Sequence, residues 1–138
     1  MKIRAWAEDL LTSNEGPLDS ARAKITIAEG TDSTTFTIRV TGMDPSAAGS
    51  VLGAHLHTGP CIEGEGTAAG PHYNQQVVVG GKSFAEAEIS PNTEVWFDLV
   101  ADEEGMAYDE TTVPFVPVDP DGIMSVVVHV TSTNTDPC

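Results

Sequence analysis

The sequence has 138 residues, a length typical of one domain with its own hydrophobic core, and we expect a single domain over residues 1–138. It carries 21 acidic and 6 basic side chains. The formal net charge of −15 argues against nucleic acid and anionic membranes as partners, because both would repel the protein. No apolar run approaches the roughly 18 residues of a spanning helix, so membrane insertion is not expected.

The first third of the chain alternates apolar and polar residues, which is the period of half-buried strands. The alternation is clearest over residues 23–27 and 35–41, and both segments are predicted to be strands. Turn-forming residues interrupt the pattern where it should break, at 14–17, 29–32 and 42–45.

The middle and the end of the chain add a glycine-rich loop and further strands. Residues 58–74 contain glycines and prolines but no apolar period, which predicts a loop. Residues 94–101 and 106–113 flank a short acidic turn and predict a β-hairpin, and a last strand follows Gly122. No long helical pattern is visible, so the fold class is all-β, a sandwich or a barrel.

Three of the four histidines, His55, His57 and His72, lie close together in the sequence, and His129 lies far downstream. Residues two apart on a strand project to the same face, so His55 and His57 are expected to point together, outside the core. In the last strand Val126, Val128 and Val130 are predicted to face the core, which leaves His129 on the opposite face. His72 comes from the loop, just after Gly70 and Pro71 have shaped its backbone.

Four imidazoles without a cysteine or carboxylate in the immediate motif favour Cu(II), which accepts tetragonal nitrogen ligation and stands at the top of the divalent affinity order. Zinc is the main chemical competitor. The alternative interpretation is that the His-x-His pair occurs by chance on an exposed strand. Spacing alone does not identify a redox enzyme.

Three motifs resemble the copper-zinc superoxide dismutases. Gly-Ala-His-Leu-His at 53–57 resembles that family's Gly-x-His-x-His strand, and Ala-Gly-Pro-His-Tyr-Asn at 69–74 resembles its Ala-Gly-Pro-His-Phe-Asn loop. Val-Val-Val-His at 126–129 resembles its Leu-Val-Val-His strand, so the resemblance covers about residues 23–130. It implies an immunoglobulin-like superoxide dismutase fold, a Greek-key antiparallel β-barrel or sandwich of about seven to eight strands.

The resemblance also implies a function and a ligand set. His55, His57, His72 and His129 would bind copper, and superoxide would be converted to oxygen and hydrogen peroxide by Cu(II)/Cu(I) cycling. His72 matches the family's copper-to-zinc bridge and would be the catalytic proton carrier.

The zinc site departs from the family pattern. No histidine occurs between His72 and His129, and Val95 stands where the family has a zinc histidine. We therefore expect copper but no zinc, as in the copper-only members of the family. Without zinc another group must orient His72, because a ligating imidazole usually gives its second ring nitrogen to a carboxylate, carbonyl or water. Asp98 is favoured since it matches the zinc aspartate, and Glu94 is second; the alternative is that Asp98 is an exposed acid on a hairpin.

Two cysteines, Cys61 and Cys138, allow one intramolecular disulfide. A disulfide would fit an oxidising compartment and an extracytoplasmic or secreted protein whose signal peptide is absent from this sequence. The alternatives are two unpaired thiols, or a terminal cysteine too mobile to pair. In the resemblance, Cys61 matches the loop cysteine of the family disulfide, whereas Cys138 matches its counterpart only loosely.

Electrostatics argues for low activity. No arginine or lysine follows Lys82, so the arginine that guides superoxide in the family is missing, and a net charge of −15 repels the anion. The competing hypothesis is a copper-binding or structural module with the same fold and little turnover. The sequence does not distinguish a monomer from a homodimer.

Overall fold

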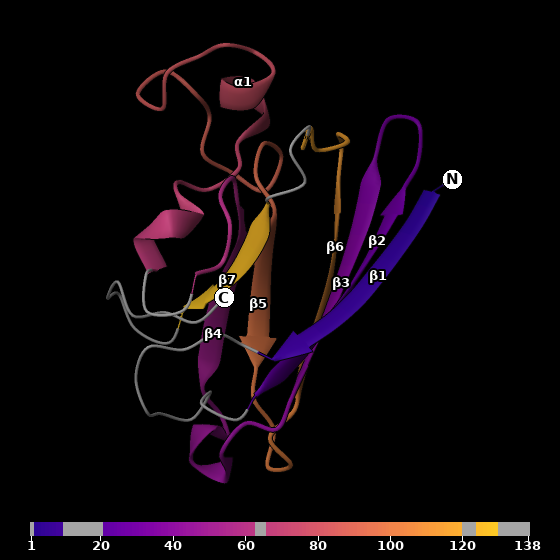
Figure 1. Ribbon diagram of the computed structural model, residues 1–138, viewed down its shortest axis with the longest axis vertical. Helices are drawn as coiled ribbons and strands as arrows, with labels where there is room; N and C mark the ends of the chain where they lie inside the picture. Colours follow the sequence, from indigo (N-terminus) through magenta and orange to yellow (C-terminus); the bar gives the residue numbers. More distant parts are fainter. Residues whose placement is uncertain (1, 10–20, 63–65, 120–123, 130–138) are drawn as a thin grey trace.

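The computed structural model describes residues 2–9, 21–62, 66–119 and 124–129, which form two antiparallel β-sheets with very little helix (Figure 1). The four-stranded sheet has the order β1 (Lys2–Asp9), β2 (Arg22–Glu29), β3 (Thr34–Thr41), β6 (Ala107–Val113). The three-stranded sheet has the order β5 (Trp96–Val100), β4 (Val51–His57), β7 (Ser125–His129). Short helical turns lie at η1 (Pro45–Ala47), η2 (Gly66–Ala69) and α1 (Gln75–Val78). The all-β prediction is confirmed.

Alternation along the strands builds the core between the sheets. In β3 the side chains of Phe36, Ile38 and Val40 are buried, and the residues between them are partly or fully exposed. Phe97 of β5 meets Phe36 edge-on across the two sheets, with ring centroids 6.3 Å apart and an interplanar angle of 79°. Because burying one such ring contributes roughly 2–3 kcal/mol, contacts of this kind hold the two layers together.

The predicted hairpin of residues 94–101 and 106–113 is wrong in its pairing. Both strands exist, but β5 pairs with β4 and β6 pairs with β3, so they belong to different sheets. The turn between them is closed by the Asp102 N–H, which donates to the Met106 carbonyl at 2.9 Å, and it carries the chain from one layer to the other. Alternation predicts a strand but does not say which neighbour completes its ladder.

β4 is the strand on which the candidate site is built. It is the central strand of its sheet and pairs with β5 on one side and β7 on the other. The long connection from β4 to β5 carries η2 and α1, and in Figure 1 the segment around α1 projects beyond the strand ends. Among the described residues, none of the helices is both long and apolar enough to cross a membrane.

Candidate metal centre

β4 presents two histidines on one face. Ala54 and Leu56 are buried and belong to the core between the sheets, so His55 and His57 project from the opposite face, as strand parity predicts. That face is not open, however. His57 is only 8% exposed, because the loop after β4 covers it. This burial differs from the expectation that both rings stand outside the fold.

The loop after β4 returns antiparallel beside the end of the strand. His57 and His72 form an isolated antiparallel bridge, and the N–H of Tyr73 donates to the Leu56 carbonyl at 2.7 Å. Gly70, two residues before His72, has a φ of +70°, a conformation that residues with a Cβ rarely adopt. This backbone path places His72 next to the two strand histidines.

The three imidazoles form a compact cluster. The rings of His55 and His72 stack with centroids 4.1 Å apart and 17° between their planes. The rings of His57 and His72 meet edge-on at 4.8 Å and 75°. One nitrogen of each ring lies within 4.8 Å of the others, so the cluster could hold a metal ion. Imidazole nitrogens are ligands that suit zinc, copper, iron and nickel.

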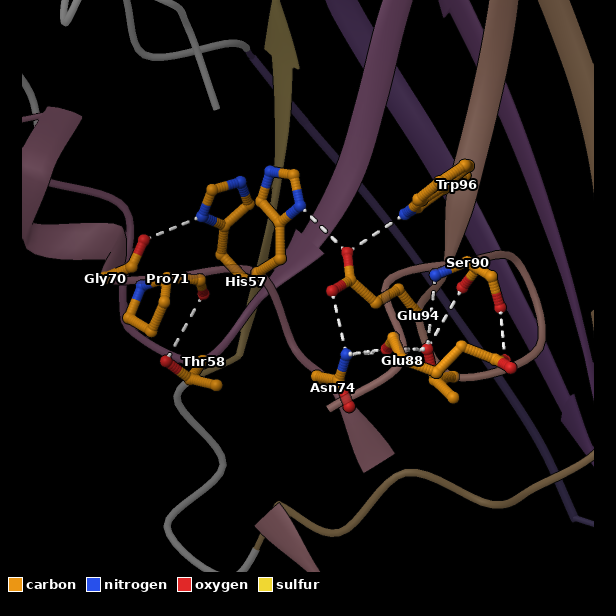
Figure 2. A network of polar contacts seen from close by, with 11 residues as sticks. His57, Thr58, Gly70, Pro71, Asn74, Glu88, Ser90, Glu94 and Trp96 are labelled. Atoms are coloured by element: carbon orange, nitrogen blue, oxygen red, sulfur yellow. Dashed lines mark hydrogen bonds and ion pairs between the residues drawn. The ribbon is translucent and has the colours of Figure 1, made fainter. Parts of the chain in front are cut away.

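Hydrogen bonding sets the tautomer of His57. Its Nδ1 lies 2.9 Å from the Gly70 carbonyl oxygen, which can only accept, so Nδ1 carries the proton and donates (Figure 2). In this tautomer the other nitrogen, Nε2, which is buried, carries a lone pair that could bind a metal ion. A backbone carbonyl on the non-ligating nitrogen is a common way to orient a metal-binding histidine.

A buried carboxylate sets the tautomer of His72. Its Nδ1 lies 2.9 Å from Oε1 of Glu94, whose side chain is 2% exposed, so Nδ1 donates and Nε2 carries the lone pair that could bind a metal ion. Two further donors bind the same carboxylate: Trp96 Nε1 lies 3.0 Å from Oε1 and Asn74 Nδ2 lies 2.9 Å from Oε2. Figure 2 shows the Glu94 carboxylate lying between Trp96 and Asn74.

The environment keeps Glu94 ionised. Burial by itself would raise the pKa of this carboxyl group, because it disfavours the charged form. The hydrogen bonds from Trp96, Asn74 and His72 act against burial and together hold the pKa of Glu94 below its ordinary value. Near neutral pH the group is a carboxylate and accepts from all three donors.

The order of preference between the two candidate acids is reversed by this geometry. Glu94 is the carboxylate on His72, whereas the side chain of Asp98 is exposed on β5. The backbone N–H of Asp98 donates to the Asp109 carboxylate of β6 at 2.8 Å. Glu94 lies just before β5, which begins at Trp96. The motif resemblance favoured Asp98 and gave no reason to prefer Glu94.

Asn74 and Trp96 belong to the site although sequence reasoning assigned them no role there. The N–H of Trp96 donates to Glu94, and its ring meets His55 edge-on, with centroids 6.1 Å apart. Asn74 lies two residues after His72 inside the quoted loop motif. The available signal was chemical: a partly buried indole N–H and a buried amide both need an acceptor.

β7 brings the position of His129 to the same face. The ladder pairs Gly53 with His129, His55 with Val127 and His57 with Ser125. Since directly paired residues point to the same side of a sheet, position 129 shares the face of the two strand histidines. Val128 is buried in the core, as predicted. The side chain of His129 lies outside the described part of the structure.

Cys61 follows β4 by four positions and is disulfide-bonded. The chain's other cysteine, Cys138, lies outside the described residues.

Comparison of the sequence with protein-family models and with curated proteins finds no match.

Proposed function

We propose that the protein is a copper-only superoxide dismutase that converts superoxide to oxygen and hydrogen peroxide. The observation that carries this proposal is the cluster of His55, His57 and His72, with the second ring nitrogen of His72 on the buried carboxylate of Glu94. Two of the three sequence motifs that resemble the copper-zinc superoxide dismutases supply these same histidines, and the third supplies His129. Geometry and motif resemblance therefore support one site.

The proposed fold is the Greek-key sandwich of that family. The order of strands supports it: the connections β3 to β4, β5 to β6 and β6 to β7 all cross from one sheet to the other. Such crossings place strands that are distant in sequence next to one another, which is how β4 acquires β7 as a neighbour.

Copper is the proposed metal because imidazole nitrogens suit it and because the motifs that supply them resemble those of the copper-zinc superoxide dismutases. Nε2 of His57, Nε2 of His72 and a ring nitrogen of His55 would bind the metal, and His129 is the proposed fourth donor, since its backbone position lies on the same sheet face. Glu94 engages Nδ1 of His72, the atom that would have to bridge to a second metal. This contact supports copper without zinc.

In the proposed reaction two superoxide anions and two protons give one molecule each of oxygen and hydrogen peroxide. Bound copper supplies the one-electron oxidation and the one-electron reduction. When Nε2 of His72 is not bound to the metal, it would take up a proton from solvent and pass it to the reduced product, while Glu94 keeps Nδ1 protonated and holds the ring in place. The side chain of His72 is 34% exposed, so solvent reaches this ring and supplies the second proton.

Charge favours the second candidate function, a copper-binding module with little turnover. A protein of net charge −15 repels superoxide at long range, which slows its approach. If the protein is an enzyme, its rate with superoxide should rise as added salt screens this repulsion.

We also propose an extracytoplasmic or secreted location. The disulfide bond of Cys61 supports it, since disulfides persist mainly in oxidising compartments.

Metal analysis of the purified protein, followed by pulse radiolysis of the copper-loaded form, tests the function. We expect copper binding near one equivalent, and superoxide decay that depends on copper and drops sharply in His129→Ala. Stable copper binding without copper-dependent turnover would leave the binding module as the function. Absence of copper binding would overturn both candidates.

A further inference from the structure

Asn74 is a fully buried amide beside the candidate metal centre, with 0% exposure. Its Nδ2 donates to Oε2 of Glu94 at 2.9 Å and to the Glu88 carbonyl at 2.8 Å. Its Oδ1 accepts from the N–H of Gln76 at 3.0 Å and so caps the start of α1. These contacts leave one possible orientation of the amide, because exchanging nitrogen and oxygen would place acceptor against acceptor.

The same amide joins the two ends of the segment between His72 and β5. The segment leaves at the cap of α1 and returns at Thr93, whose carbonyl accepts from the N–H of Gln75 at 2.8 Å. Within the segment, Oε1 of Gln76 accepts from the N–H of Glu88 at 2.8 Å. Figure 2 shows the contacts of the Asn74 amide with both Glu88 and Glu94, so the amide connects this segment to the carboxylate.

The two oxygens of Glu94 have different partners. Oε1 is shared by Nδ1 of His72 and Nε1 of Trp96, and Oε2 accepts from Asn74. The last side-chain torsion of glutamate joins an sp³ and an sp² carbon and is broad, so each contact to the carboxylate narrows its rotation. The contact to Oε2 adds a second fixed point to the two hydrogen bonds on Oε1.

We propose that Asn74 is a positioning residue of the metal centre, which holds Glu94 so that Oε1 faces Nδ1 of His72. This inference rests on the proposed copper site for its effect on metal binding. The orientation itself is a property of the metal-free protein. Asn74 therefore acts on His72 through Glu94, and through His72 on the nitrogen offered to copper.

Asn74→Asp tests the proposal because it nearly preserves shape. The substituted side chain still offers an oxygen to the N–H of Gln76, but it turns a carboxylate oxygen toward Oε2 of Glu94 and repels it. Asn92→Asp is the matched control, since it adds the same charge at an exposed position of the same segment. The double variant Asn74→Asp with Glu94→Gln restores a hydrogen bond of reversed polarity, in which the glutamine amide donates to position 74.

The first measurement is the Nδ1–H signal of His72 in the ¹⁵N-resolved NMR spectrum of metal-free protein, assigned by its loss in His72→Gln. We expect a slowly exchanging, hydrogen-bonded proton in the wild type and in Asn92→Asp, its loss in Asn74→Asp, and its return in the double variant. Copper affinity should fall about 10–100-fold in Asn74→Asp, the usual effect of losing a group that orients a ligand, and recover in part in the double variant.

An unchanged Nδ1–H signal and a copper affinity within twofold of wild type in Asn74→Asp would overturn the proposal. If Asn74→Asp does not fold, Asn74→Ser replaces it, because serine still caps α1 and lacks the second donor hydrogen. If the wild type binds no copper, the proposed function fails, while the metal-free NMR result still decides the role of Asn74.

Discussion

Replacing Glu94 by alanine removes the acceptor of three hydrogen bonds at once. The donors are His72, Trp96 and Asn74, at 2.9, 3.0 and 2.9 Å. Leaving a buried donor unsatisfied costs about 1–3 kcal/mol. His72 and Trp96 are partly exposed, so water can replace the lost acceptor there, whereas Asn74 is fully buried and bears most of the cost.

Glu94→Ala is expected to lower the free energy of unfolding by about 3 kcal/mol. The loss is limited because the alanine variant no longer has to bury a charged group, which offsets part of the lost hydrogen bonding. Urea unfolding of the metal-free, disulfide-intact protein measures it. With an m-value of about 2 kcal/mol per molar urea, the midpoint should fall by roughly 1.5 M.

Glu88→Ala is the control, since its exposed side chain bonds Ser90 on the surface while its backbone carbonyl keeps the contact with Asn74. It should change stability by no more than about 0.5 kcal/mol. A Glu94→Ala variant within 1 kcal/mol of Glu88→Ala, a difference of roughly 0.5 M in midpoint, would refute the account of Glu94 as a carboxylate that satisfies three donors.

Three more predictions concern pH, the core and a turn. The pKa of Glu94 is lower in the folded protein than its ordinary value of 4.5, so the contribution of this carboxylate to stability is complete above about pH 4.5 and is lost as the pH falls through the folded pKa. The stability difference between wild type and Glu94→Gln should therefore shrink on acidification. A stability difference that grows on acidification would contradict this. Phe97→Ala should destabilise by about 3–5 kcal/mol in urea unfolding, because the ring is 1% exposed and packs on Phe36 between the sheets; a loss below 1 kcal/mol would rule out this packing. Gly105→Ala should lower the thermal midpoint of unfolding more than Gly49→Ala does. Both glycines have positive φ, but a Cβ at Gly105 would also clash with the Met43 carbonyl, whereas a Cβ at Gly49 meets open space. Equal effects of the two substitutions would argue against the close approach of Gly105 and Met43.

Strand parity is the part of the site that local sequence predicts well. Ala54 and Leu56 face the core, so His55 and His57 share the other face, and no knowledge of the rest of the chain is needed for that. What parity could not predict is the cover over that face. His57 is buried because the returning loop lies on it and the Gly70 carbonyl binds its ring.

The choice between Glu94 and Asp98 shows where alignment of motifs stops being informative. Asp98 matches a familiar pattern, yet on β5 it alternates with the buried Phe97 and Leu99 and is exposed. Glu94 precedes the strand, in a turn whose path is set by contacts among Asn74, Glu88 and Thr93. Those contacts join residues up to 19 positions apart, so the local pattern around either acid does not contain them.

The sequence by itself determined the all-β class, most strand positions, and the pairing of two imidazoles on one strand face, because each follows from the two-residue period of an extended chain. Only the tertiary structure decided that β5 and β6 lie in different sheets, that the ladder with β7 puts position 129 on the histidine face, and that Glu94 is the acid on His72. Sheet pairing and loop return depend on which distant segments satisfy one another's hydrogen bonds and cover one another's apolar faces. No local period carries that information.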